Sequence, residues 1–220
     1  MSRVARRLAG HAMSTRQRAL IHRIVAFVLD YPDEELIARL PQLYAATATL
    51  GEPVAGRLHA LLDHLGSTPL AELTADYVAT FDLRRRCCLY LTYYAYGDTR
   101  KRGVALLTFK QAYRRGGLEL AAQELPDHLC VLLEFAATTD AEVGTRLLLE
   151  HRAGLELLRL ALVDAHSPYS DALVAVSATL PPLAGPEREA VARLAAEGPP
   201  GEDVGLEPFG HPTTWEHGHE

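Results

Sequence analysis

The spacing of apolar and polar residues predicts helices along most of the chain. Between positions 15 and 29, Leu20, Ile24 and Phe27 recur three or four residues apart with arginines between them, which is the spacing of a helix with one buried face. Runs of β-branched residues are scarce, so we expect an all-α protein with a single compact domain of nine or ten helices. Tyr31 and Pro32 are expected to stop the helix at 15–29, and Pro32 with the acidic residues 33–35 is expected to start the next one. Further helices are predicted at about 42–49, 53–65, 69–80, 99–115, 126–138, 140–149, 155–162 and 167–180.

The most apolar stretch is CCLYLTYYAY, residues 87–96. On a helix its apolar side chains would cover several faces at once, so we expect a helix buried on all sides at the centre of the core. A buried strand is the alternative, because tyrosine favours strands and periodicity alone does not separate the two. Gly97 and Asp98 favour the helix, as its stop and as the N-cap of the next one. Ten residues between two basic clusters are too few to span a bilayer.

Local signals mark several helix ends. Residues 14–17 and 139–142 have the form of capping boxes, with Ser14 and Thr139 as the caps. Pro41 is expected to separate two helices, because proline interrupts a helix interior. In the turn ELPDH, residues 124–128, Pro126 suits the first helical position and Asp127 suits the positive end of the helix dipole. The helix that follows is expected to turn Leu129, Leu132, Leu133 and Ala136 inward.

The charge of the 220-residue chain is unevenly distributed. The net charge is −6, but residues 82–117 carry nine basic and two acidic side chains, whereas residues 118–220 carry eighteen acidic and five basic ones. Such polarity can steer a charged partner. Nucleic acid is not the expected partner, because the chain is net acidic and the aromatic residues among its basic clusters are predicted to be buried.

The two ends differ in composition from the middle. Residues 1–13 are basic without an apolar stripe and are predicted to be a disordered lead to the helical domain, residues 14–180. Residues 181–220 hold more than half of the thirteen prolines, so they are predicted to form a flexible acidic tail, with one short helix at 187–197. The N-terminal region lacks the apolar segment and cleavage site of a signal peptide, which favours a cytoplasmic location.

The sequence offers no pattern for catalysis or metal binding. Cys87, Cys88 and Cys130 form no C-x-x-C pair and are expected to be small core residues in a reducing compartment. The histidines show no metal-ligand spacing, and there is no phosphate-binding loop, dinucleotide fingerprint or nucleophile with a credible base. We therefore expect neither an enzyme nor a metal protein. A cluster of three histidines, His211, His217 and His219, is expected to bind metal only adventitiously.

The strings YVATFDLRRRCCLYLTYYAYGDTRKRG and LPDHLCVLLEFAA resemble the molybdenum cofactor assembly chaperones, or delta-subunit proteins, of respiratory nitrate reductase. This resemblance implies a TorD-like helical chaperone fold. It also implies that the protein binds the apo catalytic subunit, including its N-terminal segment, and assists insertion of the molybdenum cofactor. It implies no cofactor of the chain's own beyond transient contact with that of the client, no stable membrane insertion, and molybdenum cofactor biosynthesis proteins as further partners.

Candidate residues for binding the client peptide come from the resemblance and from the aromatic residues near the centre of the chain. The resemblance points to the turn with Glu124, Asp127 and His128, and a helical domain that binds a peptide helix also needs an apolar groove with a polar rim. Two alternatives to a dedicated chaperone remain open: a generic helical adaptor, and a cofactor or metal carrier using the cysteines or His128. The other predicted contacts are Tyr77, Phe81, Arg84 and Tyr94.

Overall fold

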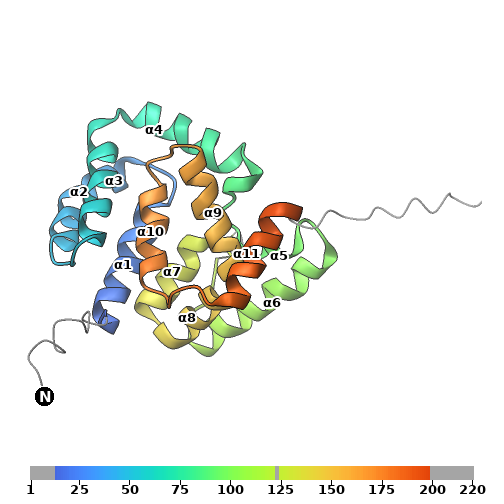
Figure 1. Ribbon diagram of the computed structural model, residues 1–220. Coiled ribbons are helices and arrows are strands. Elements are labelled where there is room, and N and C mark those ends of the chain that lie inside the picture. Colours follow the sequence, from blue (N-terminus) through green and yellow to red (C-terminus); the bar gives the residue numbers. More distant parts are fainter. Residues whose placement is uncertain (1–12, 122–123, 199–220) are drawn as a thin grey trace, which may run out of the picture.

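The computed structural model describes residues 13–121 and 124–198 and builds them from helices (Figure 1). The all-α prediction is confirmed. The α-helices are α1 (Thr15–Val28), α2 (Glu34–Thr47), α3 (Val54–Ser67), α4 (Leu70–Tyr77), α5 (Leu91–Tyr96), α6 (Arg100–Arg115), α7 (Leu129–Thr138), α8 (Ala141–Glu150), α9 (Arg152–Asp164), α10 (Ser170–Ala178) and α11 (Gly185–Glu197). A π-helical segment, Val78–Asp82, continues α4, and a single 3₁₀ turn spans Arg85–Cys87.

The core is built by packing early helices against late ones. Helix α1 lies against α7 and α10, and α3 also packs on α10, so the two halves of the chain are interleaved (Figure 1). The buried face of α1 carries Ile21, Ile24 and Val25, as its sequence spacing predicts. The buried ring of His22 lies 2.8 Å from the Thr179 hydroxyl beyond the end of α10, which adds a polar link between these two helices.

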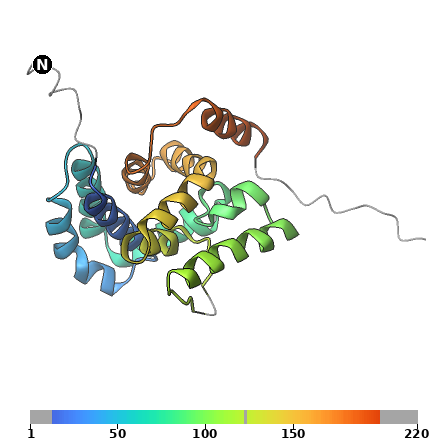
Figure 2. The same cartoon turned by 90° about the horizontal axis from the view of Figure 1, so that it is seen from below.

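Helices α6 and α11 lie at the edge of the molecule (Figure 2). Helix α6 packs mainly on the short α5, and it leaves Val104 and Leu107 exposed. Helix α11 packs on α9. The short helix predicted at 187–197 within the C-terminal segment is present as α11, Gly185–Glu197. The predictions for residues 1–12 and 199–220 lie outside the described residues.

Helix ends follow local capping chemistry with three corrections. Thr99, not the predicted Asp98, is the N-cap residue of α6. The predicted capping box at Ser14 and Gln17 is present. Asp140, not Thr139, caps α8, because its carboxylate accepts the backbone N–H groups of Glu142 and Val143. Pro41 does not separate two helices but lies inside α2.

Packing accounts for the continuity of α2 through Pro41. Leu36, Leu40 and Leu43 are all buried on one side of this helix. An interior proline removes one backbone hydrogen bond, and the burial of this apolar stripe on both sides of the proline offsets that loss.

The central helix predicted at 87–96 is only half formed. Helix α5 begins at Leu91, while the backbone at Cys88 and Tyr90 is extended. The Leu91 N–H donates to the carbonyl of Asp127 at 3.1 Å, and the Leu129 N–H donates to the carbonyl of Leu89 at 2.9 Å. These bonds satisfy backbone groups that a helix would otherwise have paired. The result is an antiparallel bridge between Tyr90 and His128 rather than a continuous helix or a strand.

Candidate functional site

The bridge between Tyr90 and His128 brings the two most distinctive stretches of the sequence together. Their side-chain rings meet edge to face with centroids 5.1 Å apart. Both side chains are partly exposed. The predicted site therefore has a defined centre, in which the turn before α7 is hydrogen-bonded to the segment that leads into α5.

Asp127 anchors this centre from inside. It is fully buried, and its Oδ2 accepts the backbone N–H of Thr92 at 3.2 Å as well as the Thr92 hydroxyl. The Arg102 guanidinium lies 3.6 Å from the same oxygen and donates to the Thr92 hydroxyl at 3.2 Å. It also lies over the Tyr90 ring, 5.6 Å from the centroid.

The expected start of α7 is thus corrected. The helix begins at Leu129 with His128 as its N-cap residue, so Pro126 is not its first residue and Asp127 does not lie in its first turn. The prediction that Leu129, Leu132 and Ala136 face inward is confirmed, as is that for Leu133. The Tyr113 hydroxyl donates to the carbonyl of Pro126 at 2.7 Å and holds the turn from the α6 side.

Three exposed carboxylates lie close enough to the bridge to shift the pKa of one of its two side chains. Burial lowers the pKa of His128, while Asp30, Asp127 and Glu124 act in the opposite direction. Burial raises the pKa of Tyr90, and Asp127 and Asp82 contribute in the same direction. We call Asp30, Asp82 and Glu124, which are exposed, the acidic rim. Asp30 lies just after α1, Asp82 ends the π-helical segment and Glu124 lies in the turn before α7.

A cluster of aromatic rings adjoins the acidic rim. Tyr77 and Phe81 are 6% and 7% exposed and contact the buried Tyr169, with Phe81 and Tyr169 centroids 5.0 Å apart. The Tyr77 hydroxyl donates to the carbonyl of Leu29, immediately before Asp30. Tyr31 packs edge to face on Tyr77 and is half exposed. Tyr31 is not among the predicted contacts, because its place after a helix end and before Pro32 indicates only a stop signal.

The other two predicted contacts occupy different environments. Tyr94 is 2% exposed, and its hydroxyl donates to the carbonyls of Arg86 and Cys88 at 2.9 Å each, which fixes the bend before the bridge. Arg84 is exposed on the short connection between the π-helical segment and the 3₁₀ turn. Of the predicted contacts, Glu124, His128 and Arg84 are thus exposed or partly exposed, whereas Tyr77, Phe81, Tyr94 and Asp127 are buried.

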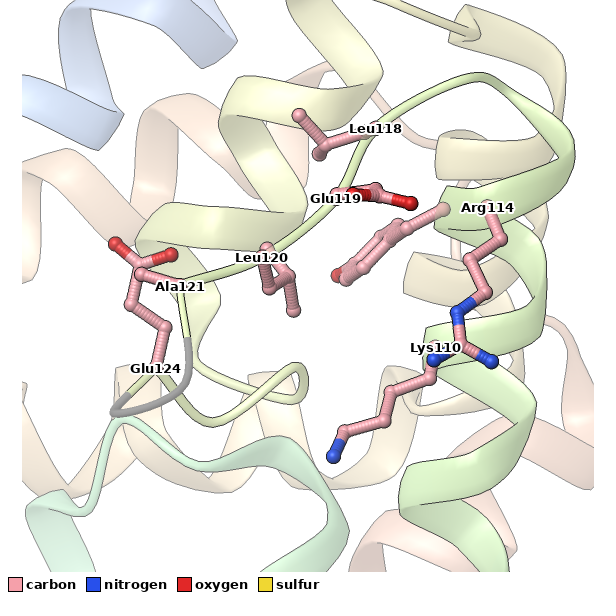
Figure 3. A pocket seen from close by; sticks show the side chains of 8 residues that line it. Lys110, Arg114, Leu118, Glu119, Leu120, Ala121 and Glu124 are labelled. Carbon is pink, nitrogen blue, oxygen red and sulfur yellow. The ribbon is translucent and has the colours of Figure 1, made fainter.

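A small hollow of about 220 Å³ lies beside the turn, between α6 and the segment after it (Figure 3). Lys110 and Arg114 line it from α6, opposite Glu119 and Glu124, and Tyr113 contributes its ring. Basic side chains from α6 thus line one side of the hollow, and the segment after α6 contributes acidic residues. This volume suits a side chain rather than a cofactor, since small-molecule pockets usually measure about 300–1,000 Å³.

The cysteines are packed as small apolar residues. Cys87 and Cys130 are buried and Cys88 is partly buried, all with free thiols. Burial raises the pKa of each thiol. Within residues 13–121 and 124–198, no three His, Cys, Asp or Glu side chains are grouped to hold a metal ion. The histidines at 211, 217 and 219 lie outside the described residues.

Comparison with known proteins identifies the family. Residues 47–175, more than half of the chain, match the family model of the nitrate reductase delta subunit. The chain belongs to this family. It is 31% identical over 169 residues to the "Probable nitrate reductase molybdenum cofactor assembly chaperone NarJ" of Bacillus subtilis, covering 76% of this chain and 92% of that protein. It is also 31% identical to Escherichia coli K12 NarJ over 150 residues, which is 67% of this chain and 64% of NarJ.

A further relative is much longer than this chain. The "Nitrate reductase-like protein NarX" of Mycobacterium tuberculosis H37Rv is 38% identical over 160 residues. The match covers 73% of this chain but only 24% of NarX, so the chain spans about a quarter of that protein. The relatives of delta-subunit type are named as assembly chaperones, not as catalysts.

The expected chaperone fold is confirmed by a solved structure. The crystal structure of a "Putative Redox Enzyme Maturation Protein" from Archaeoglobus fulgidus superposes with a TM-score of 0.53 at 21% identity, over 72% of this chain and 91% of that one. Among the described helices, none is long and apolar enough to cross a membrane.

Proposed function

We propose that this protein is a dedicated assembly chaperone that binds the apo catalytic subunit of a respiratory nitrate reductase and assists insertion of the molybdenum cofactor. The observation that carries the proposal is the match to NarJ of Bacillus subtilis along 92% of the length of that protein. The proposed place of action is the cytoplasm, before the enzyme is complete. Molybdenum cofactor biosynthesis proteins are proposed as transient partners at the same step.

The proposed binding surface for the N-terminal segment of the client is the acidic rim with its neighbouring rings. Glu124 and His128 would contact the client directly, and Tyr31 would offer it an exposed aromatic face. Tyr77 and Phe81 would support the ring of Tyr31 from below. A client segment with both basic and apolar side chains fits this combination of carboxylates and rings.

The remaining predicted residues have indirect or peripheral roles in the proposal. Asp127 and Tyr94 would act as positioning residues, because their polar atoms are used inside the protein. Arg84 would meet an acidic side chain of the client at the edge of the surface. The carboxylates of the rim would attract basic client residues over a distance of about 8 Å at physiological salt, the length over which charges are screened.

The test is a calorimetric titration with a synthetic peptide of the N-terminal segment of the catalytic subunit. The double variant Asp30→Asn with Glu124→Gln removes two rim charges while the buried network is kept. We expect its affinity to fall about tenfold at low salt, which corresponds to about 1.4 kcal/mol, and less at high salt. The matched control is Glu34→Gln with Glu35→Gln, which removes two exposed charges at the start of α2.

Equal affinity of the rim variant and the wild-type protein would place the peptide elsewhere on the surface. The wider proposal is tested by affinity purification of the full chain from cells that assemble the reductase. Recovery of the apo catalytic subunit as the dominant partner is expected. Recovery of many unrelated proteins in similar amounts would indicate a generic helical adaptor.

A further inference from the structure

Helix α6 has an outward face on which large apolar side chains are exposed. Val104 and Leu107 are 68% and 55% exposed. They lie three positions apart and therefore on the same side of the helix, opposite the buried Phe109 and Tyr113. Burying this apolar pair against another surface would be favourable, because it removes the two side chains from water.

The apolar pair on α6 lies between basic residues. Arg100 comes one turn before Val104, and Arg114 comes two turns after Leu107 on the same side; both arginines are exposed. The whole helix carries six basic residues and no acidic one. Within the part of the chain that the structure describes, Arg102 alone among the six forms ion pairs. The outward face of α6 therefore suits an acidic segment with apolar anchors.

The chain itself contains a segment of that chemistry, residues 199–220. It has no lysine or arginine and five acidic residues, which are Glu202, Asp203, Glu207, Glu216 and Glu220. Large apolar residues alternate with them along the segment, namely Val204, Leu206, Phe209 and Trp215. A segment of this composition buries too little apolar surface to fold alone, but it can order on another surface.

The end of α11 lies close enough for residues 199–220 to reach α6. Figures 1 and 2 both place this end on the side of the molecule where α5 and the start of α6 lie. An extended chain from Gly198 to Trp215 spans at most about 55–60 Å, and a random coil of that length spans about 20–25 Å. The sixteen residues of α6 extend over about 24 Å. Trp215 can therefore reach any position along α6.

We propose that residues 199–220 dock on the outward face of α6 of the same chain. Phe209 and Trp215 cover Val104 and Leu107, and the carboxylates of the segment lie beside the basic residues at the two ends of the helix. While it is docked, the segment keeps other acidic chains from this face. The interaction goes beyond the proposed function and does not depend on it. It also differs from the acidic rim, whose charge has the opposite sign.

The tether makes even a weak contact sufficient for docking. A short flexible connection gives the segment an effective concentration on the order of millimolar at the surface it can reach. If the free peptide bound with a Kd of about 0.1 mM, the tethered segment would be docked in about nine molecules out of ten. Because the charges are screened over about 8 Å at physiological salt, docking should weaken as the salt concentration rises.

The test uses the fluorescence of Trp215, which is the only tryptophan of the full chain. The variant Val104→Glu with Leu107→Glu replaces the apolar pair by like charges. Its matched control is Leu160→Glu with Val163→Glu, which changes two exposed apolar residues of α9 in the same way. We expect acrylamide to quench the wild-type and control chains about threefold less strongly than the α6 variant, because most of their Trp215 rings are covered.

A second variant tests the contribution of charge. Arg100→Gln with Arg114→Gln keeps the apolar pair, so we expect quenching between that of the wild-type chain and that of the α6 glutamate variant. Raising the salt concentration to about 1 M should increase the quenching of the wild-type chain. Circular dichroism checks that each variant keeps its helices. Unchanged quenching both in the arginine variant and at high salt would overturn the proposal, because the charge complementarity would then have no effect.

Three further results would also overturn the proposal. In the first, the wild-type chain is quenched as strongly as a synthetic peptide of residues 199–220, which means that Trp215 is not covered. In the second, Trp215 is protected equally in the wild-type chain and the α6 glutamate variant, which places the segment elsewhere. In the third, protection disappears on about hundredfold dilution, which indicates docking on a second copy, since an intramolecular contact does not depend on protein concentration.

Discussion

Asp127 and Thr92 are joined by two hydrogen bonds in the interior, although thirty-five residues separate them along the chain. Neither side chain is exposed to solvent. A buried carboxylate needs such donors, because it has lost its hydration. The pair holds the turn before α7 against the start of α5, and it thereby sets the position of the Tyr90–His128 bridge.

The first prediction concerns this pair. We expect Asp127→Asn to lower the free energy of unfolding by about 1–3 kcal/mol, because it weakens the hydrogen bonds to Thr92 and removes the charge that faces Arg102. Urea denaturation followed by circular dichroism measures the change. The control Glu124→Gln, on the exposed side of the same turn, should stay within about 0.5 kcal/mol of the wild-type value. Equal midpoints for Asp127→Asn and the control would contradict the anchoring role.

A second prediction concerns the close approach of α8 to α7 at Gly144. A Cβ atom on Gly144 would lie 2.6 Å from the Cα of Ala136, so α8 could not stay as close to α7. We expect Gly144→Ala to cost about 1–3 kcal/mol of stability through overpacking. Gly103→Ala is the matched control in a helix, since a Cβ there meets nothing within 4 Å. It should stabilise the protein by about 0.5–1 kcal/mol. Thermal melts of both variants measure this, and a stabilised Gly144→Ala variant would refute the packing argument.

The adjacent tyrosines Tyr93 and Tyr94 should respond differently to truncation. Tyr94 is 2% exposed and donates to two backbone carbonyls, whereas Tyr93 is only partly buried. We expect Tyr94→Ala to lose about 3–5 kcal/mol, enough to unfold a marginal domain, and Tyr93→Ala to lose clearly less. Tyr94→Phe keeps the ring and should lose about 1 kcal/mol with the hydroxyl. Soluble yield and urea midpoints of the three variants test this, and the prediction fails if Tyr93→Ala is the more damaging change.

Stability should fall in mildly acidic solution because of His22. Burial, and secondarily the charge of Arg18, lowers the pKa of His22 from 6.5 to about 4. Between pH 6.5 and about 4, the unfolded state therefore binds a proton on His22 that the folded state does not bind. The contribution of neutral His22 to the free energy of unfolding is fully present above pH 6.5. It is lost as the pH falls towards 4, and the loss amounts to up to about 3 kcal/mol.

The His22→Gln variant measures this contribution directly. It keeps a polar group beside Thr179 but does not titrate in this range. The difference in unfolding free energy between pH 7 and pH 4.5 should be smaller in the variant than in the wild-type protein. The contributions of other histidines, such as His128 and His151, cancel in this comparison. An unchanged difference would mean that His22 titrates alike in the folded and unfolded states.

Sequence spacing predicted helices reliably where each helix packs by one face. The inward residues of α1 and α7 follow the three-to-four spacing, and Ser14 caps α1 as its local sequence indicates. These features depend on neighbours within one or two turns, which lie within reach along the chain. The family resemblance of residues 76–139 could also be recognised from the sequence, because its motifs are continuous stretches of the chain.

The candidate site could be predicted only in part. Glu124 and His128 are at least partly exposed, as client contacts require, and Tyr77 packs between Phe81 and the half-exposed Tyr31. The interior position of Asp127, however, depends on Thr92 and Arg102, which lie 35 and 25 positions away in the sequence. Spacing along the chain does not show which distant donor a carboxylate will meet. The sequence therefore predicts Asp127 as a first-turn residue and client contact, whereas its carboxylate is buried and bonded to Thr92.

By itself, the sequence determined the helical class, most helix positions and the membership of a chaperone family, because these follow from local periodicity and from family motifs. Only the tertiary structure decided that the apolar stretch at 87–96 breaks into an extended bridge and a short helix, and that α11 rests on α9. In both cases the competing local conformations differ little in energy, so contacts between distant segments select one of them. Backbone groups of Leu89 and Leu91 find partners in the turn before α7, and the apolar stripe of α11 finds the side of α9.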